Sequence, residues 1–287
     1  MIRSSALYGA LVIFSISGLH AQPSVAPGGV LNAASYAKDA NGLGSPVSPG
    51  SLVAIFGGFS GAILASADTI PFSTNLGNVT VSFNGISAPL QLVSPGGAFP
   101  FVTAQVPFEV LPQGQTSGVV NVVVSVNNTP SAAEQTNIVA AAPGVFTIPP
   151  DGQSNAVFVF VDPSDGIPKI AAPASASIGY PTAPVARGTA GFFYATGLGA
   201  MTPAVVDGAG GSDDPSIVPR ANATPTVLVG GITAEVQFAG QAPGYPGVSQ
   251  INIVIPQNAP TGSAVSLQIQ TADGSVTSTA RATIAIQ

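Results

Sequence analysis

The fold is indicated by residues 79–93, VTVSFNGISAPLQLV, and by a second stretch with the same pattern, residues 227–238, VLVGGITAEVQF. In both, apolar residues alternate with small or polar ones on either side of two turn residues. These are Asn84-Gly85 in the first stretch and Gly230-Gly231 in the second. A two-residue loop requires positive φ, which Asn and Gly adopt at little cost. Each stretch therefore predicts a β-hairpin.

The residues that flank each turn should pair across the hairpin and share one face. The predicted pairs are Phe83 with Ile86, Val81 with Ala88, Val229 with Ile232, and Val227 with Ala234. The surrounding strands recur too, because position 51 corresponds to 189, 107 to 256 and 122 to 267. This repetition predicts two tandem immunoglobulin-like β-sandwiches related by internal duplication. The alternative is a single large barrel built from all the strands.

The composition also indicates an all-β fold. The 287 residues are 46% hydrophobic and only 6% charged, with 34 Gly and 27 Pro. Disordered chains have the opposite balance of hydrophobicity and charge. Long helices need charged residues on their exposed faces, whereas abundant Gly and Pro suit short strands joined by tight turns.

Four segments are predicted along the chain. Residues 1–21 are a signal peptide, with the basic Arg3, an apolar run at 6–18 and small residues near the end. The first sandwich covers 22–146 and the second 187–287, with a linker at 147–186 that contains a β-hairpin. The apolar run is too short to span a membrane, so we expect no membrane span after cleavage and a secreted or cell-surface location.

Several kinds of chemistry are excluded after cleavage. The chain has no Cys, and its one histidine, His20, leaves with the signal peptide. Zinc sites built on His or Cys and Ser-His-Asp triads are therefore ruled out. The three glutamates, Glu109, Glu134 and Glu235, are not brought together by any sequence pattern. With a formal net charge of −6 the protein is a poor partner for nucleic acid, and we expect no enzyme activity.

A series of short motifs resembles a known domain family. In chain order they are NAASY at 32–36, SPGSLV at 48–53, FNGI at 83–86, AQVPFE at 104–109, APGVF at 142–146 and YATGLG at 194–199. Their order is similar to that of the Solibacter uncharacterised C-terminal domain family. The resemblance implies an exported protein of acidobacterial type. It implies no activity and no catalytic residue, because the family has none assigned.

Three aspartates lie in a glycine-rich loop of the second repeat: Asp207, Asp213 and Asp214. Calcium prefers several oxygen ligands, so this loop is a candidate calcium site, and no other cofactor is expected. The spacing does not match an EF-hand. The alternative is a solvated loop, because Asp-Gly and Asp-Pro pairs are ordinary turn formers.

Aromatic residues in Gly- and Pro-rich loops are the candidate ligand contacts. Phe99 and Phe101 lie at 96–101, and Tyr245 lies in the equivalent loop at 243–247. Exposed rings could stack on sugars or dock a protein. The alternative is that they fold back and close the ends of the sandwiches.

Two functions follow from these features. The first is a secreted, non-catalytic module that attaches to a cell surface or assembles with other extracellular proteins through loops or strand edges. The alternative is a carbohydrate-binding module that uses the loop aromatics, with or without calcium, to hold a polysaccharide.

Overall fold

A computed structural model describes residues 21–278 and 281–287. The predicted signal peptide therefore lies almost entirely outside the described residues. In the described ranges, all the elements of regular secondary structure are β-strands, which confirms the all-β prediction. No helix in these ranges is long and apolar enough to cross a membrane.

Unit one, which contains β1 to β11, is a sandwich of two sheets. The first sheet contains, in spatial order, β1 (Ser24–Asn32), β2 (Leu52–Gly58), β8 (Phe101–Gln105), β7 (Leu90–Ser94) and β3 (Ala65–Ser66). The second contains β10 (Thr129–Pro130), β9 (Ser117–Val126), β5 (Val79–Phe83) and β4 (Asn75–Leu76), with β11 (Glu134–Val139) on β9 and β6 (Ile86–Ser87) on β5. Between them lies a core that includes Ile55, Phe83, Leu90 and Val122.

Unit two, which contains β12 to β25, has its own core around Phe158, Phe193, Ile251 and Leu267. Its main strands are β15 (Phe158–Val161), β16 (Pro168–Ala171), β18 (Ala190–Thr196), β21 (Thr226–Val229), β22 (Ile232–Gln241), β23 (Ser249–Val254), β24 (Gly262–Gln270) and β25 (Thr283–Ile286). The short strands are β12 (Gly144–Val145), β13 (Thr147–Ile148), β14 (Asn155–Ala156), β17 (Thr182–Ala183), β19 (Met201–Thr202) and β20 (Arg220–Ala221).

Strand pairing joins the predicted linker, 147–186, to unit two. β12 pairs with β18, and β15 pairs with both β16 and β18. The chain therefore passes between the units at 140–143, a few residues before the boundary predicted at 146. The apolar strand within this segment explains the difference, because it supplies Phe158 and Phe160 to the core of unit two.

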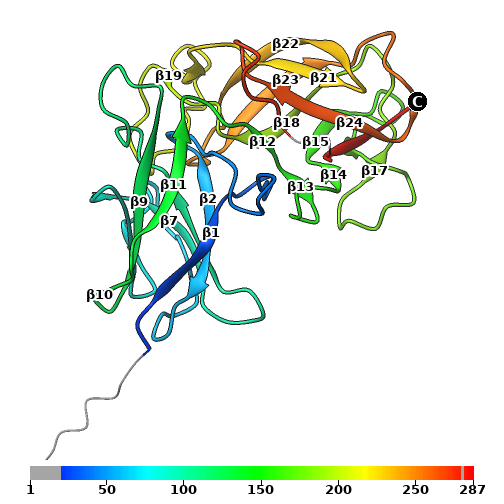
Figure 1. The fold of residues 1–287 in the computed structure, drawn as a ribbon. Coiled ribbons are helices and arrows are strands. Elements are labelled where there is room, and N and C mark those ends of the chain that lie inside the picture. The colour runs from blue at the N-terminus through cyan, green and yellow to red at the C-terminus, as the bar shows by residue number, and fades with distance from the viewer. Residues whose placement is uncertain (1–20, 279–280) are drawn as a thin grey trace, which may run out of the picture.

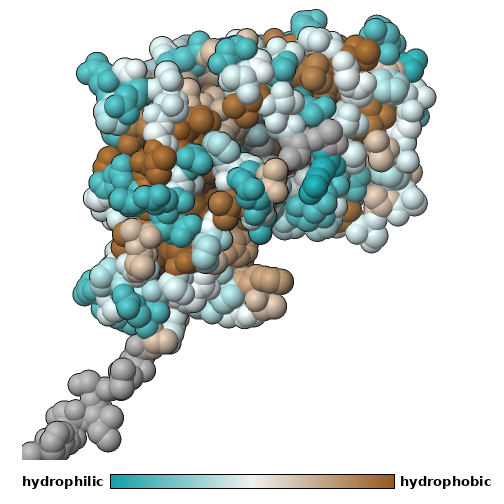
Figure 2. All heavy atoms as spheres, viewed as in Figure 1, coloured by the Kyte–Doolittle hydropathy of each residue, from teal (hydrophilic) through white to brown (hydrophobic). Residues whose placement is uncertain are grey.

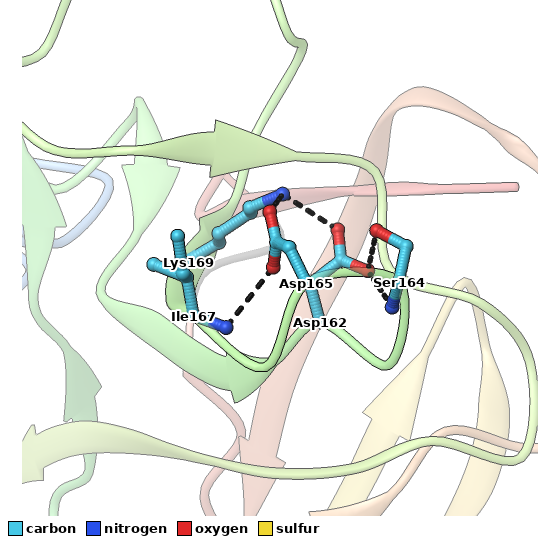
Figure 3. A network of polar contacts seen from close by, with 5 residues as sticks. All are labelled: Asp162, Ser164, Asp165, Ile167 and Lys169. Carbon is cyan, nitrogen blue, oxygen red and sulfur yellow. Dashed lines mark hydrogen bonds and ion pairs between the residues drawn. The ribbon is translucent and has the colours of Figure 1, made fainter.

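The hairpin of this segment ends in the turn at 162–166, as Figure 3 shows. The Nζ atom of Lys169 lies 2.8 Å from Asp162 and 2.7 Å from Asp165. Hydrogen bonds from Lys169 and Ser164 lower the pKa of Asp162 to about 2. The turn is thus held by charge-assisted bonds at the surface.

Both hairpins that define the repeat form as predicted. Phe83 pairs with Ile86, and the amide of Ala88 donates to the carbonyl of Val81 over 2.9 Å. In the second hairpin Val229 pairs with Ile232 and Val227 with Ala234. All four turn residues, Asn84-Gly85 and Gly230-Gly231, have positive φ.

The two units also share their longer-range strand registers. Phe83 pairs with Val122 in unit one, and the corresponding residues Val229 and Leu267 pair in unit two. Leu52 pairs with Gln105, as Ala190 pairs with Val254. Parallel bridges join Val47 to Ile138 and Val185 to Ile286. These registers are compatible with the predicted duplication.

The units form an L, with unit one upright and unit two across its top (Figure 1). Buried hydrogen bonds cross the junction. Thr196 Oγ1 accepts a bond from the amide of Leu52 at 2.8 Å and donates to the carbonyl of Gly247 at 2.6 Å. Gln105 Oε1 accepts from the amide of Gly208 at 2.6 Å. The junction therefore has specific polar contacts rather than a single covalent tether.

Candidate binding groove between the two units

A groove of about 480 Å³ lies at the inner corner of the L, and we call it the interunit groove. Unit one lines it with Ala33, Tyr36, Leu52, Gln91, Leu92, Phe101 and Thr103. Unit two lines it with Phe146, Thr147, Pro150, Val157, Tyr194, Tyr245 and Val248. Among the described residues that line it, none is charged. A largely apolar hollow with a few polar groups is typical of a ligand site.

The wall from unit one is built on the outer face of β2 and β8. Phe56 and Phe101 pair across these strands, and their ring centroids are 5.8 Å apart. The ring of Tyr36 lies 6.3 Å from that of Phe56. Leu52 and Ala33 pack beneath the three rings, so the aromatic wall stands on a buried apolar layer.

Tyr36 is held at the rim by the NAASY motif. Asn32 Oδ1 accepts bonds from the amides of Ala34 and Ser35, at 2.9 and 3.1 Å. Asn32 Nδ2 donates to the carbonyl of Ala142, which ties this loop to the crossing segment. Tyr36 itself has φ of 48°, an unusual value for a bulky residue. Burial raises the pKa of its hydroxyl, which stays protonated and able to donate a hydrogen bond.

The wall from unit two is built on the outer face of β18 and on the loop at 243–247. The rings of Tyr194 and Tyr245 are 6.2 Å apart, and Phe192 lies 5.6 Å from Tyr194. Burial, and then the neighbouring Tyr245, raise the pKa of Tyr194. Gln241 Nε2 donates to the carbonyl of Tyr245 at 3.3 Å and so holds the loop against β22.

Two of the three aromatic residues predicted to bind a ligand meet in this groove. Phe101 comes from unit one and Tyr245 from unit two, whereas Phe99 is 77% exposed and does not line the groove. Tyr245 is 58% exposed. Neither Phe99 nor Tyr245 is folded back over a sandwich end. Sequence reasoning missed Tyr36 and Tyr194, although Tyr194 alternates with the buried Phe193 and Ala195 along its strand.

The three aspartates proposed for calcium do not converge. Asp207 Oδ1 accepts a bond from the amide of Phe108 at 3.0 Å, in the junction between the units. Asp214 accepts two bonds from Ser216 within its own turn. In the described part of the chain no three His, Cys, Asp or Glu side chains form a group that could hold a metal ion. The predicted calcium site is therefore not assembled, because one ligand faces the junction and another stabilises a local turn.

One carboxylate contact was not foreseen. Glu109 lies close enough to Asp207 to raise the pKa of Asp207, although burial is the larger cause. The other two glutamates make separate contacts. Glu134 accepts a bond from the amide of Gly28 at 2.7 Å, and Glu235 accepts one from Gln237 at 3.4 Å. No sequence signal could have joined Glu109 to Asp207, because they meet only through the packing of the two units.

Comparisons with known proteins add little to this description. No protein-family model matches the chain, and neither does any curated protein sequence. Among solved structures, the chain is similar to SGBP-B of the Bacteroides ovatus mixed-linkage glucan utilization locus, in complex with a heptasaccharide. The identity is 12% and the TM-score 0.34, over 84% of this chain and 42% of that one. The chain thus spans less than half the length of that protein.

Two further solved structures have lower scores. The I9-I11 tandem from titin is 10% identical, with a TM-score of 0.20 over 84% of this chain and 61% of that one. The D00-D0 domain of intimin is 13% identical, with a TM-score of 0.19 over 85% of this chain and 96% of that one.

Proposed function

We propose that this chain is an exported, non-catalytic binding protein whose ligand is a saccharide held in the interunit groove. The observation that carries the proposal is the arrangement of four rings, Tyr36 and Phe101 from one unit and Tyr194 and Tyr245 from the other, along one groove. The flat, electron-rich face of an aromatic ring attracts the polarised C–H groups on the face of a sugar ring. Rings on both walls could contact both faces of a sugar.

Polar groups at the groove suit the hydroxyl groups of a sugar. Gln91 and Thr103 line the groove beside the tyrosine hydroxyls, whereas the hydroxyl of Thr147 is already bonded within its own turn. These side chains both donate and accept hydrogen bonds, as sugar hydroxyls do. A charged ligand would lose its hydration here without gaining an ionic partner. An uncharged saccharide therefore fits the groove better than an acidic one.

Assembly through exposed strand edges, the other function predicted from the sequence, has less support. Four strands at or near the edges of the sheets, β3, β4, β10 and β17, are two residues long, and such short edges offer few unpaired backbone groups to a neighbour. The edge strand β1 is longer, with nine residues at the end of its sheet. On the face that Figure 2 shows, hydrophobic residues lie in separate patches among hydrophilic ones. Surface attachment remains part of the proposal if the saccharide belongs to a surface polymer.

The proposal is tested by affinity electrophoresis of the mature protein in gels that contain neutral polysaccharides. We expect retardation by at least one polymer and about a tenfold weaker affinity for Tyr245→Ala, the loss equivalent to about 1.4 kcal/mol. Phe99→Ala is the matched control, because it removes an exposed ring outside the groove. Equal binding by wild type and Tyr245→Ala, or equal losses in both variants, would contradict the proposal.

A further inference from the structure

A second hollow lies beside the interunit groove, on the outer face of unit two. Its volume is about 350 Å³, and Val159, Phe192, Gln237 and Asn252 are among the residues that line it. As in the groove, none of the described residues that line it is charged. The linings of the two hollows are thus uncharged, and the nearby Glu235 accepts a bond from Gln237 at the border of the second one.

Strand register explains which side chains face this hollow. β18 and β23 pair Phe192 with Asn252 and Tyr194 with Gln250. Neighbouring residues on these strands, such as Phe193 and Ile251, are fully buried. Side chains alternate between the two faces of a sheet, so the two rings and the two amides project together on the outer face. We call these four residues the β18 platform.

The two amides of the platform bond to each other and still offer groups to a ligand. Gln250 Nε2 donates to Asn252 Oδ1 over 2.8 Å. This bond uses one polar atom of each amide, so the carbonyl oxygen of Gln250 and the amino group of Asn252 can accept and donate elsewhere. A row of amides beside a row of rings offers stacking and hydrogen bonding to the same ligand.

The platform is continuous with the groove. The centroid of Phe192 is 5.6 Å from that of Tyr194, which is 6.2 Å from that of Tyr245. The three rings therefore form a path from the second hollow into the groove. Two cations on this sheet already have partners, since Arg220 lies 4.8 Å over the ring of Phe238 and Lys169 is paired with Asp162 and Asp165.

From this geometry we infer that the ligand is a linear, uncharged polysaccharide chain that runs from the interunit groove across the β18 platform. The inference rests on the proposed function and extends it, because a groove alone would accept a single sugar or a chain end. The rings are inclined by 77° and 54° to one another, so they offer faces and edges in turn along a path with amides beside it, and this length suits several units of a polymer better than one. The net negative charge of the protein, formally −6, disfavours an acidic polymer.

The experiment is isothermal titration of the mature protein with neutral oligosaccharides of two to six units, using cello-, xylo- and manno-oligosaccharides as probes. For the series that binds, the affinity should rise about tenfold from the shortest to the longest member. Asn252→Ala should reduce binding of the hexasaccharide toward that of the disaccharide and leave the disaccharide unaffected. Phe192→Ala, whose ring packs on Tyr194, should weaken the hexasaccharide more than the disaccharide. Tyr245→Ala should weaken both.

Each other outcome overturns a stated part of the account. If Phe192→Ala and Asn252→Ala both bind the hexasaccharide as wild type does while Tyr245→Ala loses affinity, the platform is wrong and the groove stands. If no neutral saccharide binds, the proposed function itself is wrong. Equal affinity for polygalacturonate would overturn the preference for an uncharged chain. Phe99→Ala and the melting temperature of each variant serve as controls.

Discussion

The two units of this protein use equivalent outer faces in different ways. In unit one, Ala54 and Thr103 pair at the centre of the face, and both are buried. In unit two, the corresponding pair is Phe192 and Asn252, which are larger and partly exposed. The small pair lies where the face is covered, and the large pair lies where it is open. The comparison indicates that equivalent positions are covered in unit one and open in unit two.

A second difference concerns the strand that leaves each hairpin. In unit one this strand is interrupted at Pro89, between β6 and β7, because proline cannot donate to a β-ladder. In unit two β22 is continuous: it pairs with β21 up to Ala234 and with β23 from Glu235, and a register shift follows between Val236 and Phe238. Unit one thus breaks the strand at a proline, whereas unit two keeps one strand that pairs with two partners in turn.

The largest loss of stability is expected from truncating a core side chain, at a position where the two units carry residues of different size. Phe83→Ala should lower the free energy of unfolding by about 3–5 kcal/mol, because it removes a fully buried ring. Val229→Ala removes only two methyl groups at the corresponding position and should lower it by about 2 kcal/mol. Denaturant unfolding of both variants measures the two values. Equal losses would show that the repeats are not packed in the corresponding way.

The two hairpin turns should respond unequally to the same substitution. At Gly85, which has φ of 82°, an added Cβ meets no atom within 4 Å. Gly85→Ala should therefore lower the free energy of unfolding only by the cost of holding Ala at positive φ, about 1–2 kcal/mol. At Gly230 an added Cβ would also clash with the Pro260 ring, so Gly230→Ala should lower the free energy of unfolding by more than Gly85→Ala does. A melting temperature that falls further for Gly85→Ala would contradict the turn geometry.

The junction between the units should depend on one buried hydroxyl. Thr196→Val keeps the shape of the side chain but leaves the amide of Leu52 and the carbonyl of Gly247 without this partner. We expect a loss of about 1–3 kcal/mol in the free energy of unfolding. Thr202→Val, at an exposed hydroxyl, is the control and should change stability by less than about 0.5 kcal/mol. Similar losses of stability in both variants would show that the junction hydrogen bonds do not stabilise the fold.

The smallest effect is expected at the surface hairpin of unit two. The pKa of Asp162 is about 2, below its value near 3.9 in the unfolded chain. The ionised carboxylate therefore stabilises the fold fully at a pH above the unfolded pKa, and this stabilisation is lost as the pH falls toward 2. Lys169→Met removes the main cause of this shift. The difference in melting temperature between wild type and variant should therefore shrink between pH 5 and pH 2. A difference that is constant over this range would contradict the ion pair.

Local patterns in the sequence predicted the strands and turns well. Period-two alternation and the turn residues Asn84-Gly85 and Gly230-Gly231 depend on neighbouring residues alone, and the structure confirms the hairpins they predict. The segment at 147–186 is interpreted as a linker because it lies between the two repeats, and its hydrophobic strand predicts that it packs on one of them. Its pairing with β18 depends on distant residues that no local pattern reveals.

The groove could be predicted only in part. The sequence predicts both Phe101 and Tyr245 in Gly- and Pro-rich loops with little else to explain a large ring, and the structure places Phe101 instead at the start of β8. That they line the same groove follows from the packing of the two units, which local sequence does not encode. The same holds for Asp207, since the junction places its carboxylate against the amide of Phe108, a contact that local sequence does not encode.

The most direct test of the account asks whether both units hold one ligand. Wild type, Phe101→Ala, Tyr245→Ala and the double variant are titrated calorimetrically with the neutral oligosaccharide that binds best. We predict one saccharide per chain and about tenfold weaker binding for each single variant, although their rings come from different units. Two independent sites per chain, or a saccharide that binds Phe101→Ala as tightly as wild type, would contradict the claim that the groove between the units is the binding site.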